Sequence, residues 1–90
     1  MVKRAYVRYR GTVQGVGFRY AAQSIARAFA ISGYVKNVTD GAVEIVAEGD
    51  EGEVVSFLAK VDERMGDLVR SKDVKWLGGT GEFHAFTVRF

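Results

Sequence analysis

The residues best suited to chemistry lie together in the stretch from Gly11 to Arg19, which reads GTVQGVGFR. Gly15 and Gly17 permit backbone angles that other residues avoid, so successive N–H groups can converge into a nest for an anion. A helix that begins at the end of the stretch would add the partial positive charge of its N-terminus. Arg19 supplies a guanidinium that can bind two oxygens of one phosphate. The stretch therefore predicts a phosphate-binding loop with Arg19 beside it, formed by Gln14, Gly15, Val16, Gly17 and Phe18.

Two better-known glycine loops do not match this stretch. A Walker loop has Lys-Ser or Lys-Thr after its last glycine, whereas Phe18 and Arg19 follow Gly17 here. The dinucleotide fingerprint has a different glycine spacing and an acid after a second strand. A plain strand-to-helix turn with a surface arginine remains the structural alternative.

Asn37 is the second candidate for a functional role. It shares a strand face with Val35, which belongs on the side that helices would cover, so its amide must find a partner there. A second strand can bring its residues near the start of the first helix, and the Asn37 amide could then reach a water beside a bound phosphate. The alternative is a strand-end asparagine that caps the hairpin.

Length and composition narrow the class of protein. The 90 residues suffice for one hydrophobic core, so we expect a single domain over residues 1–90. The chain has no cysteine, which excludes disulfides, thiolate metal ligands and cysteine nucleophiles. Its one histidine, His84, cannot supply a zinc ligand set, and we expect His84 to be structural. With no apolar run of about 18 residues and no signal-peptide pattern, we expect a cytoplasmic protein without membrane contact.

Charge is divided unevenly along the chain. Residues 1–39 carry seven basic side chains and no acid, whereas residues 40–90 carry six basic and eleven acidic side chains. The basic half could attract an anion, or the opposite charges of the two halves could meet on the folded surface. We expect Glu44, Glu48, Glu51 and Glu53 to form a solvated acidic face.

The first half of the chain reads as a strand, a helix and a hairpin. Residues 4–12 alternate, with Ala5, Val7 and Tyr9 on one side, which predicts a half-buried strand. An apolar stripe at helical spacing, from Phe18 to Phe29, predicts a helix that runs to about Ala30. Residues 34–38 and 42–48 then read as two strands joined by a turn at residues 39–41.

The second half predicts one more helix and further strands. Acidic residues from 49 to 53 favour a helix start, and the helix carries an apolar stripe of Val54, Phe57, Leu58, Val61 and Met65. Residues 74–77, a glycine-rich turn and a last strand over about residues 83–90 follow. We expect Trp76 and the phenylalanines to pack in the core or at its rim. The order predicts an α+β, ferredoxin-like split βαβ sandwich, an antiparallel sheet with two helices packed on one face.

The sequence resembles the acylphosphatase family over essentially its whole length. The resemblance rests on the unbroken VQGVGFR at residues 13–19, on GYVKN at residues 33–37, on DGAVE at residues 40–44 and on the Phe83-x-x-Phe86 ending. It implies hydrolysis of the carboxyl–phosphate bond of a small acyl phosphate without metal or cofactor. Arg19 would bind the phosphoryl group and Asn37 would place the attacking water.

The chemistry of acyl phosphates agrees with this implication. Phosphoryl transfer depends mainly on positioning and charge stabilisation. The leaving group is a carboxylate, whose conjugate acid has a pKa of roughly 4, so no general acid is needed at neutral pH. An amide is not a base, so the role of Asn37 must be orientation. The proton of the water would then pass to an oxygen of the substrate's own phosphate.

Rival functions come from other classes. An open sheet face bearing Arg4, Tyr6, Arg8 and Arg10 could bind single-stranded RNA, but the aromatic signature of RNA-binding sheets is missing, and we expect no nucleic-acid partner. A phosphate loop without turnover could serve a sensor or carrier domain for a phosphorylated metabolite. Acylphosphatase-like domains also occur inside larger carbamoyl-transferring maturation proteins. No heptad repeat or long apolar edge is visible, so we expect a monomer.

Overall fold

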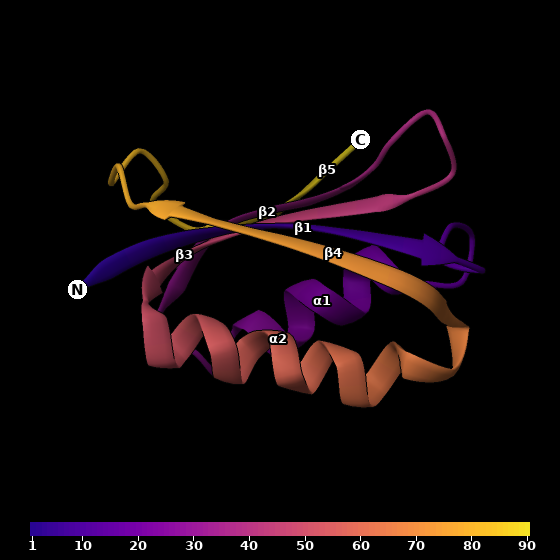
Figure 1. The fold of residues 1–90 in the computed structure, drawn as a ribbon, viewed down its shortest axis with the longest axis horizontal. Helices are drawn as coiled ribbons and strands as arrows, with labels where there is room; N and C mark the ends of the chain where they lie inside the picture. Colours follow the sequence, from indigo (N-terminus) through magenta and orange to yellow (C-terminus); the bar gives the residue numbers. More distant parts are fainter.

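The computed structural model describes all 90 residues of the chain. Five strands form one sheet in the order β4-β1-β3-β2-β5, and two helices lie together on one face of it (Figure 1). The strands are β1 (Val2–Gly11), β2 (Ile31–Asn37), β3 (Val43–Asp50), β4 (Val69–Gly78) and β5 (Phe86–Arg89). The helices are α1 (Phe18–Ala26) and α2 (Glu51–Met65), and a 3-10 turn, Gly66–Leu68, follows α2. The predicted α+β ferredoxin-like class is confirmed, with β5 added in parallel to β2, so that the sheet is mixed.

The core lies between the sheet and the helices, as the alternation in β1 predicts. Ala5, Val7 and Tyr9 are buried there, facing a stripe of α2 in which all five predicted residues are buried. β3 pairs with β1 on one side and with β2 on the other, both antiparallel. The ends of β1 and β2 are therefore held by one central strand. Neither helix has the length and apolar character needed to cross a membrane.

Two elements of the first half differ in extent from the prediction. Helix α1 ends at Ala26 rather than near Ala30, and Phe29 beyond it packs edge-on against Phe57 with ring centroids 6.3 Å apart. β2 starts at Ile31 and includes Gly33 with a φ of 138°. A side chain at Gly33 would collide with the carbonyl oxygen of Val46 on β3, so glycine is needed at this position for β2 and β3 to approach so closely.

The C-terminal strands also differ from the prediction. β4 is longer than residues 74–77 and pairs with β1 from Lys3 to Gly11. β5 is shorter than residues 83–90 and covers Phe86–Arg89 alone. His84 therefore lies outside the strand that was expected to contain it and is exposed to solvent.

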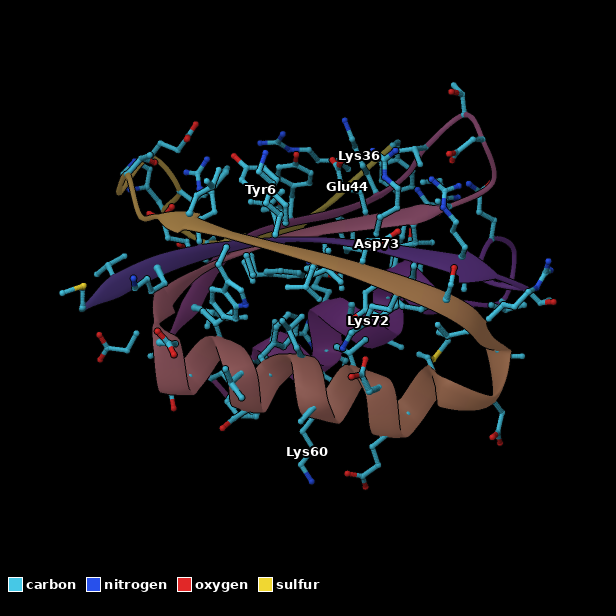
Figure 2. The ribbon with its side chains drawn as sticks, viewed as in Figure 1. Tyr6, Lys36, Glu44, Lys60, Lys72 and Asp73 are labelled. Carbon is cyan, nitrogen blue, oxygen red and sulfur yellow. The ribbon has the colours of Figure 1, made fainter.

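The sheet face away from the helices carries the ion pairs between the two halves of the chain. Arg8 binds Glu44 at 3.1 Å and Arg10 binds Asp40 at 2.8 Å, so the charges of the basic and acidic halves meet there. Tyr6, Lys36 and Glu44 project from this open face in Figure 2. The expectation that opposite charges meet on the folded surface is confirmed.

Glu48 was expected on a solvated acidic face, and that expectation is wrong. Its side chain is 3% exposed and binds the equally buried Arg4 at 2.8 Å. Burial alone raises the pKa of the Glu48 carboxyl, but N–H donors from Gly81 and Thr80 and the Arg4 guanidinium outweigh it and leave that pKa below its ordinary value. The loop after β4 folds back over β1 and β3 through these contacts, which covers Glu48.

Candidate active site

The loop between β1 and α1 is anchored at two buried side chains and exposed between them. Val13 and Phe18 are both buried, and the Phe18 ring lies 5.0 Å from the Tyr9 ring. Gly15 and Gly17 have φ values of 77° and 79°, the left-handed conformation that glycine adopts without strain. Gly17 also caps the N-terminus of α1. The sequence thus forces a tight turn that ends where the helix begins.

The backbone N–H groups of this loop are unpaired. No N–H from residue 14 to residue 17 donates a hydrogen bond to any group of the protein. The first N–H groups of α1 likewise have no partner within the helix, as at every helix N-terminus. These donors are available for an anion, and the partial positive charge of the helix end lies at the same place.

Gln14 ties the loop to the β2–β3 hairpin. Its side-chain nitrogen donates to the carbonyl oxygens of Val38 and Ala42, both at 2.8 Å. The Gln14 side chain is therefore directed at the hairpin, and a ligand in the loop would meet the Gln14 backbone only. These contacts bring the end of β2, where Asn37 lies, to the start of α1. The hairpin cap that was the alternative role of Asn37 is thus supplied by Gln14.

Asn37 lines a cavity at the start of α1. The cavity has a volume of about 80 Å³, and one water needs about 10–15 Å³ of such space, so a group of a few heavy atoms fits. The half-buried side chain of Asn37 makes no hydrogen bond within the protein. The residues lining the cavity are Val13, Gly15, Gly17, Phe18, Arg19, Tyr20 and Asn37.

Arg19 is held by the end of the chain rather than by an acid. Its guanidinium donates to the backbone oxygen of Arg89 at 3.2 Å and lies 4.7 Å from the centre of the Phe90 ring. No carboxylate forms an ion pair with Arg19. Because its charge is not neutralised, Arg19 can bind an anion without first breaking an ion pair.

The structure brings most of the sequence-predicted site residues together. Arg19 and Asn37 line one cavity with Gly15, Gly17 and Phe18. Gln14 and Val16 belong to the same loop but do not line that cavity.

Two contributors were missed by the sequence analysis. Tyr20 lines the cavity and is 58% exposed, which its position off the apolar stripe of α1 could have indicated. Phe90 was expected in the core or its rim, but it is exposed and stacks on Arg19. No signal in the sequence could have paired Phe90 with Arg19, because the pairing depends on the parallel placement of β5 beside β2.

Comparisons of the sequence and of the structure with known proteins point to the same family. The family model described as Acylphosphatase matches residues 5–88. A curated acylphosphatase of Lactobacillus johnsonii is 40% identical over 89 residues, covering 97% of this chain and 98% of that protein. The crystal structure of acylphosphatase from Bacillus subtilis matches with a TM-score of 0.84 and 34% identity, covering 100% of both chains. The structure of T. kodakarensis HypF matches with a TM-score of 0.82 and 30% identity, covering 98% of this chain and 12% of that larger one.

Proposed function

The chain belongs to the acylphosphatase family, enzymes that hydrolyse acyl phosphates, and from this premise we propose how its residues divide the reaction. The loop N–H groups and Arg19 hold the phosphoryl group, and Asn37 orients the attacking water. The observation that carries the proposal is that unpaired N–H donors, an unneutralised guanidinium and an unpaired amide border one small cavity.

Phosphate binding is assigned to the groups that carry positive charge. In the transition state, charge is spread over the equatorial oxygens of the phosphoryl group. Fixed donors aimed at that charge stabilise it without reorganising, and removal of one such donor costs about 10²–10³-fold in rate in other enzymes. Arg19 has this character because the Arg89 carbonyl and the Phe90 ring already fix its position.

Water orientation is assigned to Asn37. Its amide oxygen can accept a hydrogen bond from a water while its amide nitrogen donates to a phosphate oxygen. The amide is unpaired within the protein and lies across the cavity from α1, so it can hold a water in line with the bond that breaks.

The remaining steps need no further protein group. The leaving carboxylate is stable without protonation, and the proton of the water passes to a phosphate oxygen of the substrate. His84 cannot accept that proton, because it lies before the start of β5. Asn37 and Arg89 lie together at the other end of the sheet, at the C-terminal ends of the parallel strands β2 and β5. The cavity lining includes no carboxylate or imidazole, the usual ligands of Mg²⁺ and Zn²⁺, so we propose a reaction without a metal ion.

The acyl group of the substrate would lie at the mouth of the cavity. Tyr20 lines it, and Val16 and Phe90 are also exposed apolar side chains of the same region. This surface suits an acyl group with an apolar part.

The two rival functions have weaker support. RNA binding would use the arginines of the open sheet face, yet Arg4, Arg8 and Arg10 each already bind a carboxylate. A sensor or carrier domain would bind phosphate at the loop without turnover. A measured rate of acyl phosphate hydrolysis distinguishes such a sensor or carrier domain from the enzyme that we propose.

The test is hydrolysis of benzoyl phosphate by the purified protein in excess EDTA. We expect turnover that survives chelation and is lost in both Arg19→Ala and Asn37→Ala. A folded wild-type protein that binds phosphate without turnover would favour the sensor reading. Variants that keep the full rate would contradict the assignment of the site.

A further inference from the structure

The side chain of Gln14 joins the two segments on which the candidate active site is built. Its amide nitrogen donates to the carbonyl oxygens of Val38 and Ala42, both at 2.8 Å. Gln14 belongs to the β1–α1 loop, and Val38 and Ala42 belong to the turn between β2 and β3, at the same end of the molecule (Figure 1). Val38 directly follows Asn37 in the chain. The loop that we assign to the phosphate therefore contacts the residue next to the amide that we assign to the water.

The two carbonyl oxygens that accept from Gln14 also close the hairpin. The Ala42 oxygen accepts from the N–H of Val38 at 2.9 Å, and the Val38 oxygen accepts from the N–H of Gly41 at 3.1 Å. A carbonyl oxygen has two lone pairs, and a side-chain amide has two donor hydrogens. Each oxygen thus binds one hairpin N–H and one hydrogen of the Gln14 amide. The hairpin keeps its own hydrogen bonds when the Gln14 amide is removed.

The two segments differ in how firmly they are held without Gln14. The loop is anchored on both sides of its exposed part by the buried side chains of Val13 and Phe18. Asn37 is the last residue of β2, and β5 pairs with β2 only as far as Lys36, so Asn37 has a strand neighbour on the β3 side alone. Loss of the Gln14 contacts should therefore leave the phosphate loop in place and let the end of β2 shift relative to it.

We propose that Gln14 is a positioning residue that holds the Asn37 amide in register with the phosphate loop. The proposal rests on the proposed function, in which Asn37 orients the attacking water. The side chain of Gln14 acts through Asn37, because both hydrogens of its amide nitrogen are used by the hairpin oxygens. In-line attack tolerates little displacement, since a shift of about 1 Å can cost on the order of 10²-fold in rate.

A double-mutant cycle on kcat for benzoyl phosphate tests the proposal. Gln14→Met keeps the length of the side chain but removes both donor hydrogens. We expect it to lower kcat roughly tenfold, a part of the loss that a full displacement of Asn37 would cause. The inhibition constant of inorganic phosphate should stay near the wild-type value, because the loop and Arg19 are intact. In the Asn37→Ala background the same substitution should change kcat by less than about twofold, because the group that it displaces is absent.

Arg10→Ala is the matched control. Arg10 also holds the β2–β3 turn, by donating to Asp40 at 2.8 Å, but it does so from β1 and not from the phosphate loop. Its kcat should stay near the wild-type value, and a loss equal to that of Gln14→Met would overturn the proposal.

Gln14→Glu is a second variant of almost unchanged shape. It places a carboxylate oxygen against the two carbonyl oxygens, which offer no hydrogen to it, so kcat should fall at least as far as in Gln14→Met. Circular dichroism reports whether each variant is folded. A folded Gln14→Glu with the wild-type kcat would overturn the proposal even if Gln14→Met did not fold.

The outcomes separate this proposal from the assignment of Asn37. If Asn37→Ala keeps the wild-type kcat, the proposed function is wrong, and the role of Gln14 falls with it. If Asn37→Ala loses kcat while Gln14→Met keeps it, only the role of Gln14 is overturned. Equal losses from Gln14→Met with and without Asn37 would also overturn that role, because Gln14 would then act through another group. A loss of phosphate affinity in Gln14→Met would assign its side chain to the phosphate loop instead.

Discussion

The open face of the sheet and the loop at the start of α1 are both rich in polar groups, but these groups are paired on the sheet face and largely unpaired at the loop. On the sheet face, Arg4, Arg8 and Arg10 each bind a carboxylate, and no buried side-chain polar atom of the protein lacks a partner. At the loop, the N–H groups and the Asn37 side chain have no hydrogen-bond partner within the protein, and Arg19 contacts the Arg89 carbonyl oxygen but no acid. The cations of the sheet face are therefore neutralised by acids, whereas the cation at the loop is not.

This difference shows why counting basic residues does not find a site. Seven basic side chains precede Asp40, and most of them are neutralised after folding by the acidic second half. Arg19 forms no ion pair and lies beside unpaired N–H donors, so its charge remains available for a ligand at that place. Substitutions on the sheet face should therefore change stability, and substitutions at the loop should change turnover.

The largest effect is expected at Glu48. Glu48→Gln leaves the buried Arg4 with only the half-exposed Glu82 as its charge partner, so we expect a loss that approaches the about 3–5 kcal/mol in the free energy of unfolding that breaking a buried pair costs. Urea denaturation would measure this loss, and kcat of the remaining folded enzyme should not change. Replacing both partners, as Arg4→Met with Glu48→Leu, should cost less than Glu48→Gln alone, because no buried charge is left unpaired. A larger loss of unfolding free energy in the double variant than in Glu48→Gln would contradict this account of the buried pair.

The same residue predicts a pH dependence. The folded-state pKa of Glu48 is lowered, so the stability that its ionised form contributes is fully present above its unfolded pKa of about 4.3. That stability is lost as the pH falls from there through the folded pKa. Urea midpoints measured from neutral to acidic pH should drop more steeply for the wild type than for Glu48→Gln. Parallel curves for the two proteins would contradict the coupling.

Arg19→Ala should have the next largest effect, on turnover. We expect kcat/KM for benzoyl phosphate to fall by about 10²–10³-fold, since a charged donor to the transition state is removed. The free energy of unfolding should change by no more than about 0.5 kcal/mol, as at other surface positions. Arg27→Ala is the matched control, because Arg27 is an exposed cation at the other end of α1 without an ion pair. Equal losses in the two variants would show that charge alone, rather than position, matters.

Asn37→Ala should separate turnover from binding. Loss of the group that orients the water should lower kcat by about 10²-fold, the scale of misplacing a reacting group. The inhibition constant of inorganic phosphate should stay near the wild-type value, because Arg19 and the loop N–H groups remain. Thr39→Ala, an exposed neighbour, serves as the control. Phosphate binding that is lost together with kcat would assign Asn37 to phosphate binding instead.

A smaller effect is expected at Tyr20. If its ring contacts the acyl group, Tyr20→Ala should lower kcat/KM for benzoyl phosphate by about 2–10-fold, the scale of one aromatic contact. The loss for acetyl phosphate should be smaller, because its methyl group offers little to contact. A ratio between the two substrates that does not move would place the acyl group elsewhere.

The smallest effect is expected at Phe90, which positions Arg19. An exposed cation–π contact is worth about 0.5–1 kcal/mol, which corresponds to a loss of roughly 2–5-fold in kcat/KM for Phe90→Ala. Phe90→Tyr keeps the ring and should keep the rate. If both variants behave alike, the ring does not position Arg19.

The sequence predicted what depends on local periodicity and on backbone freedom. The stripes of β1 and α2 and the left-handed glycines at 15 and 17 all follow from neighbours in the chain, and the structure confirms each. Arg19 was predicted as a site residue from the chemistry of its guanidinium, and Asn37 from its amide on a covered strand face; the structure places both at one cavity. The cavity that joins them follows from the predicted strand order.

What the sequence could not predict depends on contacts between distant segments. β4 alternates weakly because it is exposed on both faces, so its first five residues gave no strand signal. The loop after β4 covers Glu48, which the sequence did not indicate, and the two hairpin carbonyl oxygens that accept from the Gln14 side chain were equally invisible in the sequence. Such roles are set by tertiary packing, which composition and spacing do not encode.

The central claim is that the unpaired groups of the loop, and not the cations of the sheet face, hold the phosphate. Titration of ¹⁵N-labelled protein with inorganic phosphate, followed by ¹H–¹⁵N correlation spectra, tests it most directly. The account predicts saturable shifts of the amide signals from Gln14 to Tyr20, which Arg19→Ala abolishes, with β1 and β3 signals on the sheet face unmoved. Shifts centred on Arg8, Arg10 and Glu44, or loop shifts that persist without Arg19, would contradict it.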